Sequence, residues 1–225
     1  MNSNFKQILQ DLDTIVAKDP ATTGRWEAFL CSPGYHGILF YRLSHHLWQK
    51  GWRLSARLLS QFGRLLTGVE IHPGAQIGKN FFIDHGMGVV IGETTEIGDD
   101  CTLYQNVTLG GTGKDKGKRH PTLGNNVLIG SGAKVLGPFR VGDNARVAAG
   151  AVVLSEVPDN ATAVGVPARV VRINGEKPAE CTSMALDQVH VSDPVEQALQ
   201  ELRCEMGGLE QQFCHRKHTE PSDDE

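Results

Sequence analysis

The sequence predicts an α+β protein in which an N-terminal α-helical domain is followed by a parallel β-helix and a partly helical C-terminal tail. Three observations lead to this fold: apolar residues at helical spacing near the start, glycines gathered in the middle, and an aliphatic residue at every sixth position there. The domain boundaries that follow are 1–67 for the helices, 68–170 for the β-helix and 171–225 for the tail.

Residues 1–67 have the apolar spacing and the end signals of about three to five helices. The first helix is expected to stop at Asp19 and Pro20, because proline restricts the residue that precedes it. Ser32 is expected to cap a later helix that has Pro33 in its first turn and Gly51 just beyond its end. Two amphipathic faces are expected, formed by Phe5, Ile8, Leu9, Leu12, Ile15 and Val16, and by Leu54, Leu58, Leu59, Phe62, Leu65 and Leu66.

The middle of the chain is an internal repeat of six residues, and it contains 18 of the 26 glycines. The aliphatic positions are Ile71, Ile77, Ile83, Ile91, Ile97, Leu103, Leu109, Leu123, Ile129, Val135, Val141, Val147 and Val153. This period fits neither a helix nor an ordinary strand, and it is typical of a parallel β-helix in which three short strands close one triangular coil. We expect about five coils, with the aliphatic residues inside and the glycines that often follow them relieving the backbone at the corners.

The repeat is interrupted twice, and each interruption contains a histidine. The spacing is eight residues between Ile83 and Ile91, and the extra residues include Asp84 and His85. The spacing is fourteen residues between Leu109 and Leu123, and this insertion contains Arg119 and His120. Extra residues in a solenoid leave it as loops, often on the binding face, so titratable residues at both interruptions indicate a site.

The residue types at the interruptions suit acid–base chemistry and anion binding. His85 can act as a general base near neutral pH, with Glu70 or Asp84 as the carboxylate that orients its ring. The second loop, 110–120, combines Gly110, Gly111 and Gly113 with Lys114, Lys116, Lys118 and Arg119. These cations suit a carboxylate or a phosphorylated ligand, and the glycines allow a ligand to approach the backbone.

The composition excludes several classes of protein. The net charge is −4, from 22 Lys plus Arg against 26 Asp plus Glu, which argues against a general binder of nucleic acids or anionic membranes. No apolar run approaches the roughly 18 residues of a membrane span, and the N-terminus lacks the pattern of a signal peptide. The five cysteines form no C-x-x-C pair, which argues against a disulfide scaffold and against a cysteine-based zinc site. We expect the protein to be cytoplasmic.

Five segments carry a resemblance to a known family. They read GVEIHPGA at 68–75, IDHGMGVVIGE at 83–93, VTLGGTGK at 107–114, KRHP at 118–121 and GVPAR at 165–169. The region from about 68 to 170 closely resembles the serine O-acetyltransferases, which belong to the hexapeptide-repeat acyltransferase superfamily. The repeat alone indicates only the superfamily, whereas the Asp-His and Lys-Arg-His-Pro segments together are specific to the family.

The resemblance implies a left-handed parallel β-helix that assembles into trimers, with each active site between neighbouring coils. It implies direct transfer of an acetyl group from acetyl-CoA to the hydroxyl of L-serine, which gives O-acetyl-L-serine and CoA. This reaction is the first step of cysteine biosynthesis, and it needs acetyl-CoA as co-substrate and no metal.

The resemblance also implies roles for nine residues. His85 is expected to be the base that takes the serine hydroxyl proton, with Glu70 as its carboxylate partner, at a position where many members carry Asp. The serine ammonium is expected to bind Asp84 and Asp19, and the serine carboxylate to bind Arg119 with His120 beside it. Small residues are expected to line the acetyl-CoA groove: Gly111, Ser131 and Ala149.

The resemblance further implies partners. L-Cysteine is expected to be a feedback inhibitor that occupies the serine site, and the assembly is expected to be a homotrimer or a dimer of trimers. Members that bind O-acetylserine sulfhydrylase insert a C-terminal Ile into it, whereas this chain ends in Asp-Asp-Glu225. We therefore do not expect that complex to form through the last residue. We expect a short helix from Ser192 and disorder over 215–225.

Three other functions are compatible with the repeat. The first is a hexapeptide-repeat acetyltransferase whose acceptor is a sugar or an amine, which would not need the paired acids and the Arg-His segment. The second is a zinc hydro-lyase that uses His72, His85 and His120 as ligands, as catalytic zinc requires three. The third is a trimerisation or scaffold module without activity, which would leave both interruptions of the repeat unexplained.

Overall fold

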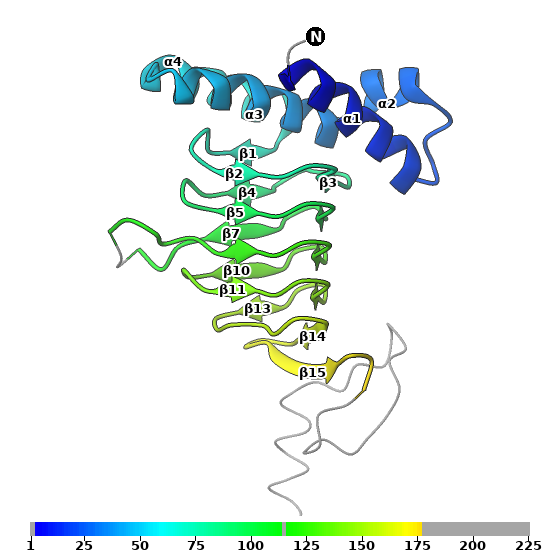
Figure 1. The fold of residues 1–225 in the computed structure, drawn as a ribbon, viewed down its shortest axis with the longest axis vertical. Helices are drawn as coiled ribbons and strands as arrows, with labels where there is room; N and C mark the ends of the chain where they lie inside the picture. Colours follow the sequence, from blue (N-terminus) through cyan, green and yellow to red (C-terminus); the bar gives the residue numbers. More distant parts are fainter. Residues whose placement is uncertain (1–2, 114–115, 177–225) are drawn as a thin grey trace, which may run out of the picture. The chain divides into compact units, whose positions relative to one another are not determined.

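Four helices precede fifteen short strands in the computed structural model, which describes residues 3–113 and 116–176 (Figure 1). The helix expected from Ser192 and the disorder expected over 215–225 lie outside these residues. The helices are α1 (Ser3–Lys18), α2 (Arg25–Cys31), α3 (Pro33–Gln49) and α4 (Arg53–Thr67). None of the helices among the described residues is both long enough and apolar enough to span a membrane.

The helices begin and end where the local sequence predicts. The Ser32 hydroxyl accepts a hydrogen bond from Tyr35 N at 3.3 Å, which caps α3, and Pro33 occupies the first turn. Gly51 and Gly68 follow α3 and α4 with φ of 85° and 69°, the left-handed conformation that glycine adopts without strain.

The helices cover the open edge of the first coil. Strands at the edge of a sheet carry backbone groups that no further strand binds. Side chains of the helices satisfy several of these groups: Tyr41 donates its hydroxyl to Ala75 O at 2.8 Å, and Ser60 donates to Ile71 O at 2.7 Å. Arg42 donates to the carbonyl of Ile77 at 2.8 Å. The helical domain therefore caps the stack of coils with hydrogen bonds as well as with apolar contacts.

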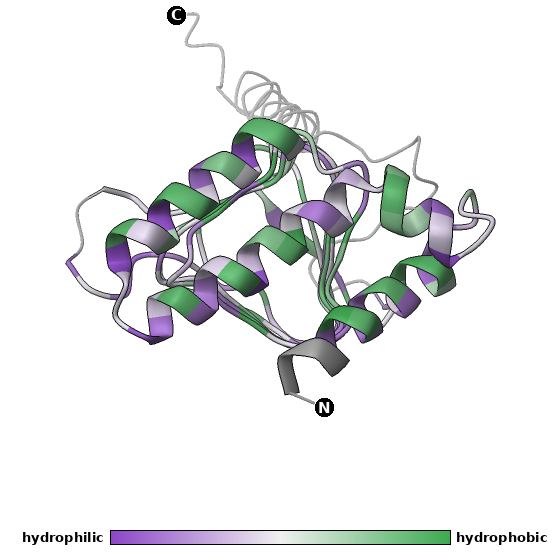
Figure 2. Ribbon diagram, turned by 90° about the horizontal axis from the view of Figure 1, so that it is seen from above, coloured by the Kyte–Doolittle hydropathy of each residue, from purple (hydrophilic) through white to green (hydrophobic). Residues whose placement is uncertain are grey.

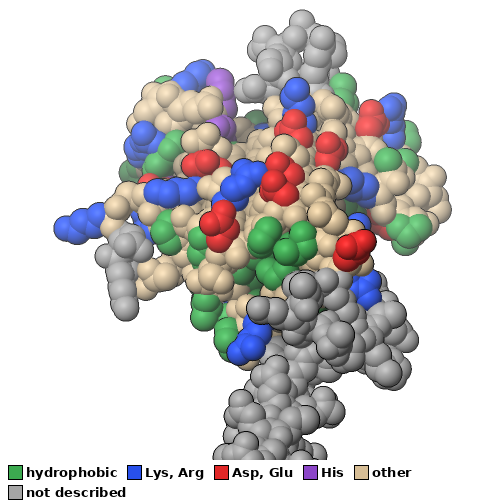
Figure 3. Space-filling model, turned by 60° about the horizontal axis from the view of Figure 1, so that its bottom comes forward, with side chains coloured by type: hydrophobic (Ala, Val, Ile, Leu, Met, Phe, Trp, Pro, Cys, Tyr) green, Lys and Arg blue, Asp and Glu red, His purple; other side chains and the backbone are tan. Residues whose placement is uncertain are grey.

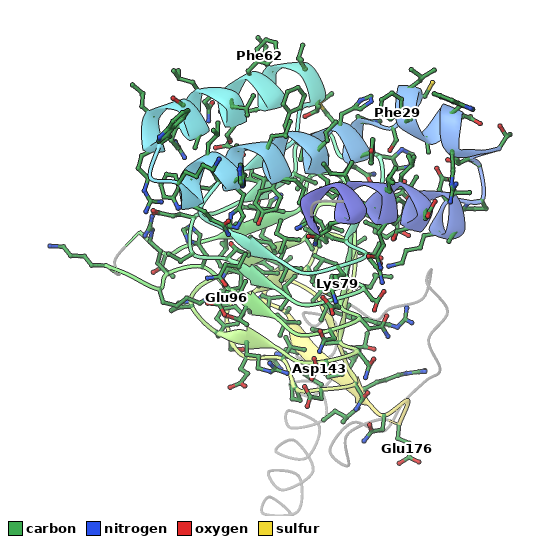
Figure 4. All side chains as sticks on the ribbon, turned by 45° about the horizontal axis from the view of Figure 1, so that its top comes forward. Phe29, Phe62, Lys79, Glu96, Asp143 and Glu176 are labelled. Carbon is green, nitrogen blue, oxygen red and sulfur yellow. The ribbon has the colours of Figure 1, made fainter. Side chains whose placement is uncertain are left out.

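Helix α4 turns its small residues inward and its large apolar residues outward. Ala56, Ser60, Gly63 and Thr67 are buried, whereas Phe62 is 52% exposed and Leu65 is 80% exposed. A side chain at Gly63 would place Cβ 2.7 Å from Cβ of Phe40, so only a small residue fits on the inner face. Apolar and polar positions alternate along the helices when they are seen from above (Figure 2), and Phe62 projects from α4 away from the coils (Figure 4).

The strands form a left-handed parallel β-helix of three sheets. Their bounds are β1 (Glu70–Ile71), β2 (Gln76–Ile77), β3 (Phe82–Ile83), β4 (Val90–Ile91), β5 (Glu96–Ile97), β6 (Thr102–Leu103), β7 (Thr108–Gly110), β8 (Thr122–Leu123), β9 (Leu128–Ile129), β10 (Lys134–Leu136), β11 (Arg140–Val141), β12 (Arg146–Val147), β13 (Val152–Val153), β14 (Ala161–Val164) and β15 (Arg169–Ile173). The sheet orders are β1-β4-β7-β10-β13, β11-β8-β5-β2 and β15-β14-β12-β9-β6-β3, so the first sheet counts five coils, as expected.

All thirteen aliphatic residues of the repeat are buried inside the coils. Each pairs with its counterpart in a neighbouring coil, as Ile71 does with Ile91 and Ile97 does with Leu123. The position four residues later is also buried where it is small, as at Ala75, Ala133 and Ala145. The period in the sequence therefore gave both the strands and the core correctly.

The glycines that follow the aliphatic residues have a different role from the expected one. They do not adopt positive φ, so they do not relieve the backbone. They allow close approach between coils: a Cβ at Gly98 would lie 2.5 Å from Gly124 O, and a Cβ at Gly130 would lie 2.6 Å from Ala149 N. Positive φ occurs two residues later instead, at Asp100 and Asn126 for example, because Asn and Asp tolerate the left-handed region.

Asn and Asp side chains form ladders of hydrogen bonds along one edge of the coils. Asn126 Nδ2 donates to Asn144 Oδ1 at 2.9 Å, and Asn144 Nδ2 donates to Asn160 Oδ1 at 3.0 Å. Beside this ladder, Lys79 N donates to Asp99 Oδ1 at 2.7 Å, and the same pattern repeats down to Asp143 N, which donates to Asp159 Oδ1 at 2.7 Å. Lys79 and Asp143 mark this edge of the coils in Figure 4. These contacts add side-chain hydrogen bonds to the backbone pairing between coils.

The last strand reverses direction. β15 pairs with β14 in antiparallel fashion and runs past residue 170 to Ile173. The view from below shows acidic and basic side chains interspersed over the described surface on that side (Figure 3). The charge on this visible face is therefore mixed, in keeping with the small net charge of the chain.

Candidate active site

The two interruptions of the repeat leave the coils as loops at two different corners. The first loop connects β3 to β4, and the second connects β7 to β8 and extends away from the coils (Figure 1). Of the basic residues in the second loop, Lys114 lies outside the described residues. Because each loop adjoins the first sheet at a different end of its strands, the titratable residues form two separate groups.

The first cluster consists of Asp19, Asp84 and His85. Nε2 of His85 lies 3.9 Å from Oδ1 of Asp84, and the His85 side chain is 74% exposed. Hydrogen bonds from the Thr22 hydroxyl at 2.7 Å and from Ala21 N at 2.8 Å hold the pKa of Asp19 below its usual value. Asp19 directly follows α1, and its carboxylate is close enough to His85 for an electrostatic interaction between the two. The cluster combines an accessible imidazole with two carboxylates.

Glu70 lies beside the first cluster but binds a residue of α4. Its Oε2 is 3.2 Å from Nη1 of Arg64. The backbone of the first loop runs along the start of β1, since Glu70 N donates to Val89 O at 2.9 Å and Gly88 N donates to Gly68 O at 2.9 Å. The structure thus brings Glu70 next to the loop of His85, with its carboxylate engaged by a guanidinium.

The second cluster consists of Glu93, Thr94, Arg119 and His120, where the second loop returns to the coils. Nη2 of Arg119 donates to Oε2 of Glu93, and this hydrogen bond lowers the pKa of Glu93 below its usual value. Nζ of the neighbouring Lys118 donates to Thr94 O at 2.7 Å and to Glu96 Oε1 at 3.0 Å. These contacts hold the base of the loop against the preceding coil.

His120 is nearly buried and is held by Thr94. Nδ1 of His120 lies 2.9 Å from the Thr94 hydroxyl and accepts from Thr94 N at 3.2 Å. Burial lowers the pKa of His120, and the nearby charge of Arg119 lowers it further. Burial likewise lowers the pKa of His72 to about 4, with Arg57 as the next cause. Both imidazoles are therefore neutral at pH 7, which leaves His85 as the accessible histidine of the two clusters.

A third feature is a column of small residues below His85. Ser131 and Ala149 follow β9 and β12 at the same corner as the first loop, and Gly150 N donates to Ser131 O at 2.8 Å. A Cβ at Gly132 or at Gly150 would meet nothing within 4 Å, so the outside of this column is open. Gly111 is not part of the column, because it lies at the second loop, where a Cβ would be 2.8 Å from Arg119 O.

Comparison with known proteins identifies the family to which the chain belongs. Residues 120–155 match the model of the bacterial transferase hexapeptide family, which describes six repeats. A serine acetyltransferase of Helicobacter pylori is 59% identical over 160 residues, which are 71% of this chain and 94% of that protein. The chain belongs to the serine acetyltransferase family.

Relatives that match over more of the chain support the same conclusion. The serine acetyltransferase of Bacillus pumilus is 48% identical over 216 residues, which are 96% of this chain and 98% of that protein. The crystal structure of the Neisseria gonorrhoeae serine acetyltransferase superposes with a TM-score of 0.74 at 40% identity, over 76% of this chain and 66% of that one. Other serine acetyltransferase structures at 40–42% identity contain serine, cysteine or CoA.

The candidate residues of this serine acetyltransferase do not form a metal site within one chain. Over the described ranges, no three His, Cys, Asp or Glu side chains are grouped so that they could hold a metal ion. His72 and His120 lie at the corner of the second loop, whereas His85 lies at the corner of the first loop. These three histidines therefore do not converge on one point within the chain.

The structure adds residues that sequence analysis did not assign. Glu93 and Thr94 hold Arg119 and His120, and Arg64 binds Glu70. Oε1 of Gln105, in the column between His85 and Ser131, is buried and makes no hydrogen bond with the part of the chain that the structure describes. Glu93 and Thr94 could have been found from their position, since they form the corner of the coil that precedes the second loop.

Proposed function

We propose that this serine acetyltransferase uses His85 as its general base and Arg119 with His120 as its carboxylate site. The observation that carries the assignment is the division of titratable groups into two clusters, one with an exposed imidazole and acids and one with a fixed guanidinium. An amino acid has an ammonium, a hydroxyl and a carboxylate, and the two clusters together offer a partner for each. A sugar or a simple amine would leave Arg119 without a matching group.

In the proposed reaction, Nε2 of His85 takes the proton of the serine hydroxyl as the oxygen attacks the acetyl carbon. The bond from the acetyl carbon to sulfur breaks, the CoA sulfur leaves, and the proton on His85 passes to it. Asp84 and Asp19 bind the serine ammonium. The Glu70 carboxylate turns from Arg64 to His85 and stabilises the imidazolium that forms when His85 takes the proton. Because the transfer is direct, the reaction needs no acyl-enzyme.

We place acetyl-CoA along the column of Ser131 and Ala149. The open outer side of Gly132 and Gly150 leaves room for a thin extended arm. The buried Oε1 of Gln105 is an acceptor without a partner among the described residues, and it suits an amide N–H of the pantetheine arm. A related serine acetyltransferase structure contains CoA, which supports the choice of ligand. The column starts below His85, so the thioester would end beside the base.

We propose that each complete site forms between two subunits of a homotrimer, or of a dimer of trimers. Within one chain the first and second clusters lie at different corners of the coil, and Gly111 lies with the second cluster. A neighbouring chain packed corner to corner would bring its second cluster against the first cluster and the column. Gly111 of that neighbour would then border the acetyl-CoA groove.

The same pocket offers a route for feedback inhibition. L-Cysteine shares the ammonium and carboxylate of L-serine, so Asp19, Asp84 and Arg119 would bind it equally well. A related serine acetyltransferase structure contains cysteine. We propose that L-cysteine competes with L-serine at this site, and that the enzyme acts in the cytoplasm.

The assignment is tested by the release of free CoA thiol from acetyl-CoA with L-serine and with a panel of sugars and amines. We expect release to require L-serine and to fall when L-cysteine is added. His85→Ala should lower kcat by about 10²-fold or more while acetyl-CoA still binds. Release with a sugar or an amine but not with serine would refute the roles of Asp19, Asp84 and Arg119.

The shared site is tested by mixing two inactive variants. His85→Ala and Arg119→Ala chains are unfolded, mixed in equal amounts and refolded together. If each site combines His85 of one subunit with Arg119 of the next, about a quarter of the sites regain both residues. If both residues act from the same chain, no mixed trimer contains an intact site, and the mixture stays as inactive as its components.

A further inference from the structure

We infer that Thr94 is a positioning residue that fixes His120 as a neutral imidazole with its proton on Nε2. His120 would then present a hydrogen-bond donor, and it could not serve as the base. The inference rests on the proposed function only in assigning His120 to the serine carboxylate. The state of the ring follows from hydrogen bonds within this chain.

The hydrogen bonds to Nδ1 leave one protonation state. Thr94 N lies 3.2 Å from Nδ1 of His120, and a backbone N–H can only donate. Nδ1 must therefore be an acceptor, and an acceptor nitrogen carries no proton. A neutral imidazole with an unprotonated Nδ1 has its proton on Nε2.

The Thr94 hydroxyl reinforces this state. Its oxygen accepts from Arg119 N at 3.0 Å and from His120 N at 3.1 Å, which uses both lone pairs. Its hydrogen remains to be donated, and Nδ1 of His120 lies 2.9 Å away. One hydroxyl thus holds the backbone of Arg119 and His120 and at the same time supplies a second donor to Nδ1.

The charges around the ring act in the same direction. Arg119 and Lys118 on the second loop disfavour a positive imidazole, and Glu93 on the preceding corner, which favours one, is engaged by Arg119. His72, from the first coil, lies near the same groups and is itself kept neutral by burial. The ring also has little freedom to rotate, because its Cδ2 and Nε2 occupy the place where a Cβ of residue 92 would lie, next to Gly92.

This state suits a site for a carboxylate. A neutral Nε2–H donates one directed hydrogen bond, and the adjacent guanidinium of Arg119 supplies the charge. A ring with the opposite tautomer would present a lone pair to the carboxylate and repel it. Thr94 therefore contributes to the selection of an acidic acceptor substrate without touching it.

The test combines nitrogen NMR of histidine-labelled full-length protein with steady-state kinetics. His120 is assigned from the signal that His120→Gln removes. In the wild type we expect the shift of an unprotonated Nδ1 and of a protonated Nε2 across neutral pH. In Thr94→Val, which keeps the shape and removes the hydroxyl, we expect the ring to titrate at higher pH. We also expect the KM for serine to rise about tenfold, with a smaller change in kcat and in the KM for acetyl-CoA.

Two variants serve as controls. Thr94→Ser keeps the hydroxyl and should restore both the NMR state and the KM for serine. Thr95→Val alters the next residue, whose buried Oγ1 makes no hydrogen bond with any described residue. It should therefore change neither the protonation state of His120 nor the KM for serine. A proton on Nδ1 in the wild type, or a Thr94→Val enzyme with unchanged titration and unchanged KM for serine, would overturn the inference. If the proton stays on Nε2 but His120→Gln leaves the KM for serine unchanged, the inference about the ring stands. The assignment of His120 to the substrate carboxylate would then be overturned.

Discussion

Oε2 of Glu70 lies 3.2 Å from Nη1 of Arg64, so a carboxylate beside the loop of His85 is bound to helix α4. The carboxylate nearest to the imidazole is that of Asp84, 3.9 Å from Nε2. Glu70 and Asp84 are therefore both candidates for the carboxylate that orients His85. They differ in their other binding partners. Glu70 must exchange Arg64 for His85, whereas Asp84 already lies beside the ring but faces Nε2, the nitrogen assigned as the base, and is also suited to the substrate ammonium.

We expect Glu70→Gln and Asp84→Asn to have different kinetic signatures. Glu70→Gln should lower kcat by about 10-fold to 10²-fold with little change in the KM for serine, because it removes charge that stabilises the imidazolium only in the transition state. Asp84→Asn should chiefly raise the KM for serine. Initial rates over a grid of serine and acetyl-CoA concentrations separate the two parameters.

Arg64→Met provides the matched control for the Glu70 assignment. It frees the Glu70 carboxylate without removing it, so kcat should stay the same or rise. If Arg64→Met lowered kcat as strongly as Glu70→Gln does, the ion pair itself would be the working arrangement, and Asp84 would become the partner of His85.

The free energy of unfolding should fall between pH 6.5 and about pH 4 because of His72. Burial lowers the pKa of this residue from 6.5 to about 4, so in that range the unfolded chain binds a proton that the folded chain does not. Stability is therefore complete above pH 6.5 and is lost as the pH falls. The shift corresponds to about 2 kcal/mol once the partial contact of the ring with water is allowed for.

Urea unfolding at a fixed protein concentration, in the wild type and in His72→Asn, checks this contribution. Asn keeps an acceptor for Gly74 N, which donates to Nδ1 of His72 at 2.9 Å, and it does not titrate. The difference in stability between the two proteins should shrink as the pH falls from 7 to 4.5. A constant difference would show that His72 is not the source of the loss.

Gly92 should be coupled to His120. A Cβ at Gly92 would lie 2.0 Å from Cδ2 of His120, so Gly92→Ala must displace the ring, and overpacking of this kind costs about 1–3 kcal/mol. In the His120→Ala background the ring is absent, so Gly92→Ala should destabilise the protein by at least about 1 kcal/mol less than in the wild type. Thermal unfolding of the four proteins of the cycle measures the coupling.

Gly98 supplies the comparison, because it also follows an aliphatic residue of the repeat but meets backbone. Its Cβ would lie 2.5 Å from Gly124 O, which no side-chain deletion relieves. Gly98→Ala should therefore be equally destabilising with and without His120. Equal coupling of both glycines to His120 would mean that the effect is general and not a contact with the ring.

The strands and the core could be predicted from the sequence because one kind of residue, the buried aliphatic, recurs at a regular period. The aliphatic positions from Ile71 to Val153 gave the strands and the core, since only their burial recurs every six residues. The two interruptions of that period marked His85 in the first cluster and His120 in the second, each with the residue that precedes it. The partners of these residues could not be predicted, because Arg64 reaches Glu70, and Thr94 reaches His120, only after the segments have packed together.

The orientation of α4 and the role of the repeat glycines could not be predicted either. An apolar face ordinarily points inward, but the inner face of α4 is limited to small residues by its contact with α3 at Phe40. Glycine is ordinarily the residue for positive φ, but at the corner that carries the asparagine ladder Asn or Asp adopts positive φ, and the glycine two residues earlier allows close approach of the neighbouring coil. In both cases spacing between elements outweighs the local preference.

Substitutions at Asn144 and Asn125, which lie on neighbouring coils, should distinguish the corner position with positive φ from the one without it. Asn144 has a φ of 57°, so Asn144→Ala loses two ladder hydrogen bonds and also places an ordinary side chain in the left-handed region, at a cost of about 1–2 kcal/mol for the backbone alone. Asn144→Gly loses only the hydrogen bonds and should be the less destabilising of the two. At Asn125, which accepts from Asp99 N at 2.9 Å and does not have positive φ, the order should reverse, because glycine there adds only entropy to the unfolded chain. Urea unfolding of the four variants gives the two orders directly, and the same order at both positions would refute the assignment of the left-handed corner to Asn144.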